Sequence, residues 1–238
     1  MPSQLTIRKR WWKIIQNRMM TKKVPGIIAA VLATFVGIYP FIYFFINRKF
    51  GLLQSKSDAV LANIFWNVGF YTHITLGGIA LLIGWTQFSV KLRTNKLKLH
   101  RQIGKVYVIA ALLSSLAAVY IAMYATGGII ASLGFISLGI IWFYTTLRAY
   151  IEIRKGQIDN HQKMMIYSYA ACFSAVTLRI YLPILTIIFH DFIKAYLLVA
   201  WLCWIPNIIV AYFLVEKLQN QKDKTYTNKR LTASRAGR

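Results

Sequence analysis

Acidic residues are scarce in this chain. Its 238 residues include 6 Asp and Glu against 29 Lys and Arg. None of the acids falls within the long apolar runs defined below, and carboxylate-driven proton pumps and cation-coupled transporters usually place an acid inside the membrane. Paired-carboxylate glycosidase, zinc-protease and P-loop patterns are absent as well. The chain therefore lacks the residues that these classes of protein need for their chemistry.

Cysteine and charge are also sparse. The two cysteines, Cys172 and Cys203, both lie in apolar runs, so we expect neither a disulfide framework nor a cysteine metal site. Charged residues make up 15% of the chain and hydrophobic residues 57%, with a mean hydropathy of +0.50. So apolar a composition cannot provide a water-solvated surface, which excludes a soluble globular protein.

What the chain has instead is a series of apolar runs of about twenty residues or more, each long enough to cross ~30 Å of hydrocarbon as a helix. We predict an all-α, polytopic membrane bundle of about six transmembrane helices. The spans are expected at 26–46, 62–90, 104–126, 128–150, 164–189 and 193–215. Very short connections after the third and fifth spans predict antiparallel hairpins.

The spans divide the chain into a basic segment (1–25), a transmembrane domain (26–215) and a basic tail (216–238). The first segment carries apolar residues at helical spacing, namely Trp11, Trp12, Ile15 and Met19. This spacing indicates a helix lying in the membrane interface, with a disordered basic segment as the alternative. The tail is polar and basic, so we expect it to be disordered near anionic headgroups.

Basic residues are distributed unevenly between the two sides of the predicted bundle. With the N-terminus inside, the cytoplasmic segments hold 24 Lys and Arg and the outer loops hold 4. The positive-inside rule therefore predicts cytoplasmic N- and C-termini. Membrane sidedness and anionic phospholipids account for the net charge of +23. Nucleic acid is not an expected partner, since nothing pairs these residues with a reading fold.

One permanent charge lies inside a predicted span. Arg179 and His73 are each roughly 15 Å from the outer end of their spans by helix rise, and so at one level. A guanidinium at this depth should face the bundle interior or a wet cavity. We expect Arg179 and His73 to form a ligand site, together with Tyr181 and Tyr107, if the second and fifth spans are adjacent. The alternative is a structural clamp in which Arg179 binds carbonyls and Tyr or Thr side chains.

A second pair of polar residues, His100 and His161, precedes the third and fifth spans on the cytoplasmic side. Each is followed by a basic residue and then by a tyrosine about two turns on. Two imidazoles from separate helices at one depth are what bis-histidine ligation of haem b requires, so the pair is a candidate metal site. The alternative is that each histidine caps a helix start and contacts lipid phosphate.

The same residues belong to a stretch, nearly half of the chain, that resembles a known protein family. The matching pieces, in order, are His73 with Gly77-Gly78 and Gln87-Phe88, Leu99-His100-Arg101 with Gly104 and Tyr107, His161 with Met165 and Tyr169, and Thr177-Leu178-Arg179. The stretch resembles a bacterial family of predicted membrane proteins, domain of unknown function 2306. The chain departs from it at Gln162 and Met164, where members often have Arg and Trp. The resemblance implies a multi-pass helical protein of the bacterial cytoplasmic membrane, and no substrate.

Three functions remain open. The chain could be a haem b redox protein with His100 and His161 as ligands, or with His73 and another partner. It could instead bind or transport a small anionic or quinone-like molecule at His73 and Arg179, or serve as a non-catalytic assembly or envelope-maintenance factor. Our leading interpretation is a non-enzymatic bundle whose His73/Arg179 site binds a small ligand or supports membrane assembly, with the haem protein as the alternative.

Overall fold

The computed structural model describes residues 26–45 and 49–236, with side chains described up to Gln221. Over these residues the chain is helical and has no strand. Six helices are long and apolar enough to cross a membrane: Gly26–Phe44, Ile64–Phe88, Leu97–Ala122, Gly128–Arg154, Ile158–Phe189 and Phe192–Gln221. The predicted all-α bundle of six spans is confirmed. The interfacial helix predicted around Trp11 and Trp12 lies outside the described residues and stays a prediction.

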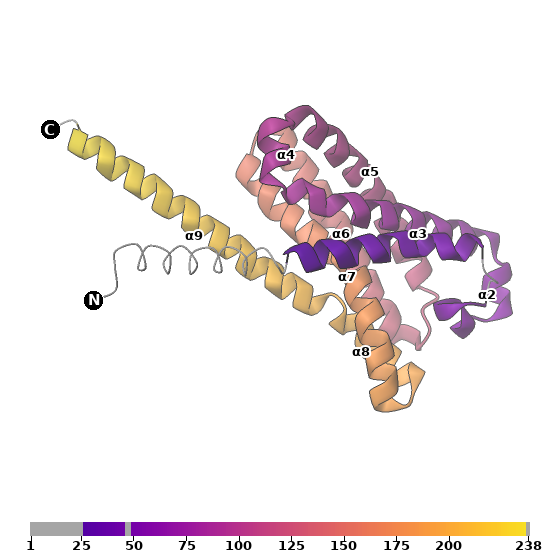
Figure 1. Ribbon diagram of the computed structural model, residues 1–238. Helices are drawn as coiled ribbons and strands as arrows, with labels where there is room; N and C mark the ends of the chain where they lie inside the picture. Colours follow the sequence, from indigo (N-terminus) through magenta and orange to yellow (C-terminus); the bar gives the residue numbers. More distant parts are fainter. Residues whose placement is uncertain (1–25, 46–48, 237–238) are drawn as a thin grey trace, which may run out of the picture.

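The elements follow one another with short connections (Figure 1). After the helix that begins at Gly26, they are η1 (Tyr39–Phe44), η2 (Gly51–Ser55), α2 (Asp58–Ala62), α3 (Ile64–Gly84), η3 (Trp85–Phe88), α4 (Val90–Asn95), α5 (Leu97–Ala122), α6 (Gly128–Arg154), α7 (Ile158–Phe189), α8 (Phe192–Leu202) and α9 (Ile205–Ala236). The elements labelled η are 3-10 helices.

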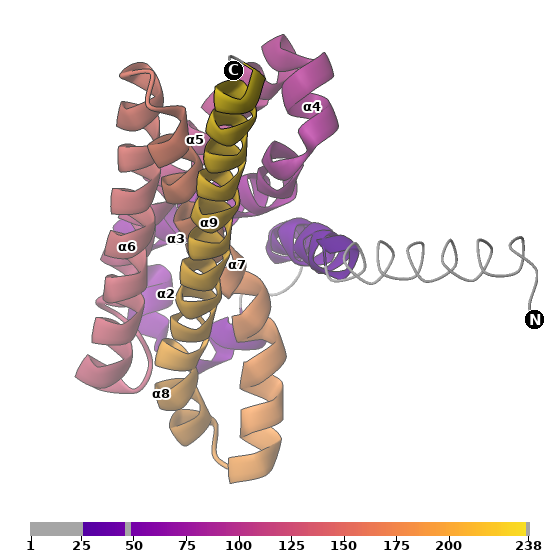
Figure 2. The same ribbon diagram turned by 90° about the vertical axis from the view of Figure 1, so that its left-hand side faces the viewer.

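Neighbouring helices pack as antiparallel pairs. α5 packs against α6, and α7 packs against α8 and α9, so the hairpins predicted from the short connections are confirmed (Figure 2). Asp191 begins α8 by accepting hydrogen bonds from the backbone N–H groups of Ile193 and Lys194. α3 packs mainly on α5 and also contacts α7. The second and fifth spans are therefore adjacent, as a joint site of His73 and Arg179 requires.

The sixth span is broken into α8 and α9. Pro206 lies in the first turn of α9, where a missing backbone N–H does no harm. The side-chain amide of Asn207 donates to the Cys203 carbonyl and to Thr177 Oγ1, each at 3.1 Å. A carbonyl that the break would leave unpaired thus finds a donor within the bundle, as the membrane interior demands.

The tail differs from the disorder expected after residue 215. α9 remains helical to Ala236, and in Figure 1 its C-terminal part extends away from the bundle. The physical reason is in the sequence, since neither Gly nor Pro occurs between Pro206 and Gly237. High polarity removes the drive to pack but does not itself end a helix, whereas Gly and Pro do.

The first span approaches α3 at two glycines. A Cβ built on Gly78 would lie 2.7 Å from the Gly37 carbonyl oxygen, and one on Gly37 would lie 2.6 Å from Leu82 Cγ. Only glycine fits at such a distance, because real Cβ atoms do not approach backbone oxygens so closely. This contact holds the first span, and η1 at its end, against the helix that carries His73.

We predict that Gly78→Ala destabilises the protein by about 1–3 kcal/mol through overpacking at this contact. The measurement is the thermal unfolding midpoint in detergent. Gly26→Ala is the matched control, since a Cβ there meets nothing within 4 Å. If the two variants unfold at the same temperature, the close contact at Gly78 is not what holds the first span against α3.

Candidate functional site

A partly open cavity of about 230 Å³ lies between α3, α5, α6, α7 and the η1–η2 segment. His73 from α3 and Arg179 from α7 both line it. Most of the remaining wall is apolar and includes Phe70 and Trp142. The two polar residues expected to share a site therefore do share one cavity.

His73 is oriented by Ser114 of α5. Its Nδ1 lies 3.1 Å from both the carbonyl oxygen and the hydroxyl oxygen of Ser114. The Ser114 hydroxyl lies 2.9 Å from the His73 carbonyl oxygen and donates to it. A carbonyl can only accept, so this arrangement assigns the imidazole proton to Nδ1 and leaves Nε2 as a hydrogen-bond acceptor. A neutral His73 can thus accept a hydrogen bond from a group in the cavity.

Arg179 keeps its charge without an acidic partner. One guanidinium nitrogen donates to the Ala175 carbonyl at 2.9 Å, and the guanidinium carbon lies 4.9 Å from the centroid of the Tyr39 ring. These are the carbonyl and tyrosine contacts of the structural alternative. Within the part of the chain that the structure describes, no salt bridge joins Arg179 to a carboxylate. The charge is held in place but not neutralised.

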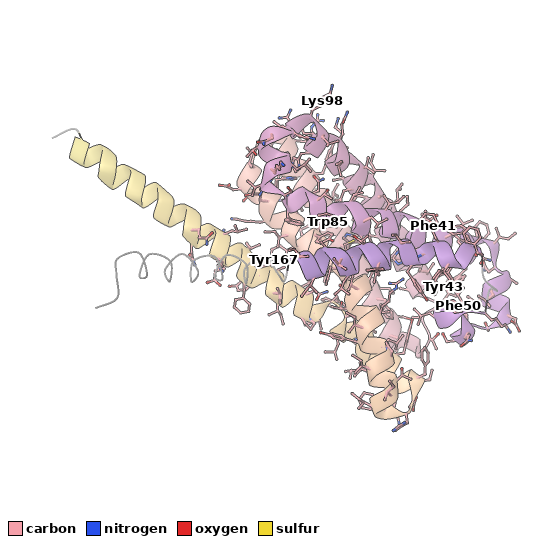
Figure 3. The ribbon with its side chains drawn as sticks, viewed as in Figure 1. Phe41, Tyr43, Phe50, Trp85, Lys98 and Tyr167 are labelled. Carbon is pink, nitrogen blue, oxygen red and sulfur yellow. The ribbon has the colours of Figure 1, made fainter. Side chains whose placement is uncertain are left out.

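Two lining residues, Tyr43 and Lys56, escaped the sequence analysis. Tyr43 packs edge-on against Phe50, with 6.2 Å between ring centroids (Figure 3). A Cβ on Gly51, whose φ is +58°, would lie 3.1 Å from the Tyr43 hydroxyl, so this phenol sits directly under η2. The Lys56 ammonium donates to the Tyr124 carbonyl, and burial lowers the pKa of Lys56 to about 8. Lys56 looked like an ordinary outer-loop lysine, because only tertiary contacts bring it to the cavity.

The other two residues expected at the ligand site lie elsewhere. Tyr181 is not among the cavity-lining residues. Tyr107 is fully buried, and its hydroxyl lies 2.8 Å from Ser168 Oγ, which in turn lies 2.6 Å from Thr146 Oγ1. This chain of hydroxyls joins α5, α6 and α7 in the core, so Tyr107 contributes to packing between helices.

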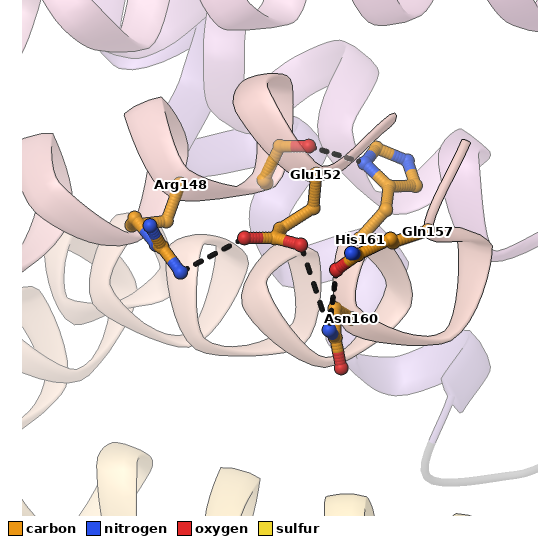
Figure 4. Close-up of polar contacts among 6 residues, drawn as sticks. Arg148, Glu152, Gln157, Asn160 and His161 are labelled. Carbon is orange, nitrogen blue, oxygen red and sulfur yellow. Dashed lines mark hydrogen bonds and ion pairs between the residues drawn. The ribbon is translucent and has the colours of Figure 1, made fainter. Parts of the chain in front are cut away.

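His100 and His161 lie near each other at the opposite end of the bundle. Their rings are close enough for their charges to interact. His161 Nδ1 lies 2.8 Å from the Ala149 carbonyl oxygen (Figure 4), whereas His100 Nδ1 is buried without a hydrogen-bond partner. Among residues 26–45 and 49–236, no group of three or more His, Cys, Asp or Glu could hold a metal ion.

A buried acid, Glu152, lies beside this pair. The expectation that no span contains an acid is wrong for α6, because the helix continues past residue 150 to Arg154. Glu152 is 3% exposed, and its Oε1 lies 2.8 Å from an Arg148 nitrogen (Figure 4). Its carbonyl accepts from the Gln157 N–H at 2.9 Å, across a turn in which Gly156 has φ +74°. The backbone of Glu152 thus stabilises the turn between α6 and α7.

We predict that Arg148→Met lowers the unfolding free energy by about 1–3 kcal/mol, because it leaves the buried Glu152 carboxylate without its cation. Arg148 is 44% exposed on its side chain, so solvent keeps the loss below that of a fully buried pair. Thermal unfolding in detergent measures the change, with the exposed Arg154→Met as control. Adding Glu152→Gln should restore part of the loss, and an unchanged midpoint for Arg148→Met would disprove the role of the pair.

Comparison with known proteins agrees with this architecture. A family model described as predicted membrane protein, domain of unknown function 2306, matches residues 70–215. The matched region contains His73, His100, His161 and Arg179. No curated protein and no solved structure matches the chain. The chain, a multi-pass helical membrane protein, belongs to the family of predicted membrane proteins known as domain of unknown function 2306.

Proposed function

We propose that this membrane protein binds a small acidic molecule in the cavity between α3, α5, α6 and α7, and that it does so without catalysing a reaction. Arg179 recognises the acidic group, and His73 accepts a hydrogen bond from the same molecule. The observation that carries the proposal is the placement of His73 and Arg179 on the wall of one cavity, where no acid of the described residues pairs with the guanidinium.

The energetics of a buried cation support this proposal. A guanidinium stays charged at any physiological pH, and a charge withdrawn from water is costly unless an opposite charge compensates it. A carboxylate or similar group in the cavity compensates Arg179 and accepts two parallel hydrogen bonds from it. The cavity of about 230 Å³ is below the range of drug-sized pockets, which suits a small molecule or the head of a quinone-like one.

The distribution of basic residues supports an orientation for the site. We place the His100/His161 end in the cytoplasm, because the segments at that end hold most of the Lys and Arg. The cavity, which η2 and Lys56 border, then faces the outer side of the membrane. The family resemblance favours the bacterial cytoplasmic membrane as the location.

We expect the detergent-purified protein to bind a simple carboxylate such as propionate or benzoate, and Arg179→Gln to weaken binding by about 10- to 100-fold, since a hydrogen-bonded charge pair is lost. Isothermal titration measures the affinity. Arg179→Lys keeps the charge but loses the planar guanidinium, so its affinity should lie between that of the unaltered protein and that of Arg179→Gln.

The control is Lys194→Gln, which removes an exposed cation of α8 that is paired with Asp191. It should bind as the unaltered protein does. The proposal fails if no carboxylate binds, or if Arg179→Gln binds as well as the control.

One observation favours haem b as a second candidate. A ligating histidine usually donates Nδ1–H to a carbonyl and offers Nε2 to the iron, and His161 makes this contact with Ala149. His100, close by, has a buried nitrogen without a partner. These two histidines would hold the haem, which would supply one-electron redox chemistry.

Optical spectroscopy tests this candidate on protein produced with added haem. A Soret band that sharpens on dithionite reduction, retained in His190→Ala but lost in His100→Ala/His161→Ala, would support it. A featureless spectrum of the unaltered protein would remove haem b from consideration.

A further inference from the structure

The cavity holds two positive charges. Lys56 lines it together with Arg179, and no Asp or Glu occurs among the described residues of its wall. The Lys56 ammonium contacts a neutral acceptor, the Tyr124 carbonyl. The preceding residue also helps to fix the position of Lys56, because Ser55 Oγ lies 2.8 Å from Thr126 Oγ1. Lys56 is therefore held at the cavity by the loop between α5 and α6.

No acid among the side chains that the structure describes forms a salt bridge with either of these two cations. At this end of the bundle Asp58 pairs with Lys49 at 2.8 Å, and Asp191 pairs with Lys194 at 3.4 Å. Glu152 pairs with Arg148 at the opposite end. The other acids whose side chains the structure describes are Asp159 and Glu216, and neither lines the cavity. An anionic occupant of the cavity would supply the negative charge that these described acids do not.

We infer that the occupant is a small organic dianion of the dicarboxylate type, with one carboxylate on Arg179 and the other on Lys56. This inference rests on the proposed function and specifies its ligand class. Two separate cations on one cavity wall match two acidic groups joined by a short chain. The apolar lining, which includes Phe70 and Trp142, suits a carbon skeleton better than an inorganic ion, whose whole surface needs polar partners.

The pH dependence of binding separates Lys56 from the other groups at the cavity. The titratable or charged residues that line it with Lys56 are Tyr43, His73, Cys172, Arg179 and Tyr196. Burial lowers the pKa of Lys56 to about 8, so its charge is present below that pH and is lost above it. A dicarboxylate stays doubly charged across this range, and its presence favours the charged lysine. Affinity should therefore fall as the pH rises through about 8 or somewhat above.

The test compares dicarboxylates with monocarboxylates of matched length, using succinate and glutarate against propionate and butyrate. Isothermal titrations are made near neutral pH and well above the pKa of Lys56. We expect the unaltered protein at neutral pH to prefer each dicarboxylate by about tenfold or more, from one added charged contact. Lys56→Gln should bind dicarboxylates only as well as it binds monocarboxylates.

Two further variants make the result specific. Lys56→Arg keeps a positive charge at high pH, so it should retain the preference for dicarboxylates where the unaltered protein loses it. It also preserves the test if Lys56→Gln does not fold. Lys194→Gln, at an exposed lysine of α8, should behave as the unaltered protein does at both pH values.

The outcomes distinguish this inference from the function on which it rests. Monocarboxylate binding that depends on Arg179, with no gain from a second carboxylate or no effect of Lys56→Gln, overturns the dianion and leaves the proposed function standing. If no carboxylate of either kind binds, both are overturned. A preference for dicarboxylates that is unchanged in Lys56→Gln would overturn the role assigned to Lys56.

Discussion

The guanidinium of Arg179 is the constraint on which the arrangement of the bundle depends. A permanent charge within a membrane span has to face protein or water, so α7 turns this residue toward α3 and the first span. Tyr39 covers it from η1, and the Ala175 carbonyl takes one of its hydrogen bonds. The close approach of the first span to α3 is what brings Tyr39 within reach, so packing between small residues and the placement of a charge are coupled here.

The number of spans and their pairing could be predicted because each depends on local sequence. A continuous apolar run must form its hydrogen bonds internally, and a short connection can only join antiparallel neighbours. Helix ends were predicted less well. α6 runs on to include Glu152, and α9 runs on to Ala236, because polar residues leave the membrane without leaving the helix. Hydropathy marks where the lipid environment stops, whereas the helical backbone continues until a residue such as Gly156, with φ +74°, interrupts it.

The sequence predicted those members of the candidate site whose positions depend only on their depth along a transmembrane helix. Helix rise alone placed His73 and Arg179 at one level, and the structure puts them on one cavity. Tyr181 is two residues beyond Arg179, which turns it by roughly 200° around the helix and away from the cavity. Lys56 and Tyr43 belong to segments whose positions depend on contacts with distant loops, such as that between Ser55 and Thr126. Sequence periodicity cannot predict such long-range contacts.

The same contacts fix the position of one part of the cavity wall. Leu52 and Leu53 of η2 form part of the cavity wall, and the hydrogen bonds of Ser55 and Lys56 fasten this segment to the loop between α5 and α6. Displacing this segment away from the loop breaks both hydrogen bonds together. The position of Leu52 and Leu53 in the cavity wall is therefore coupled to the position of the loop between α5 and α6, a segment about 70 residues further along the chain.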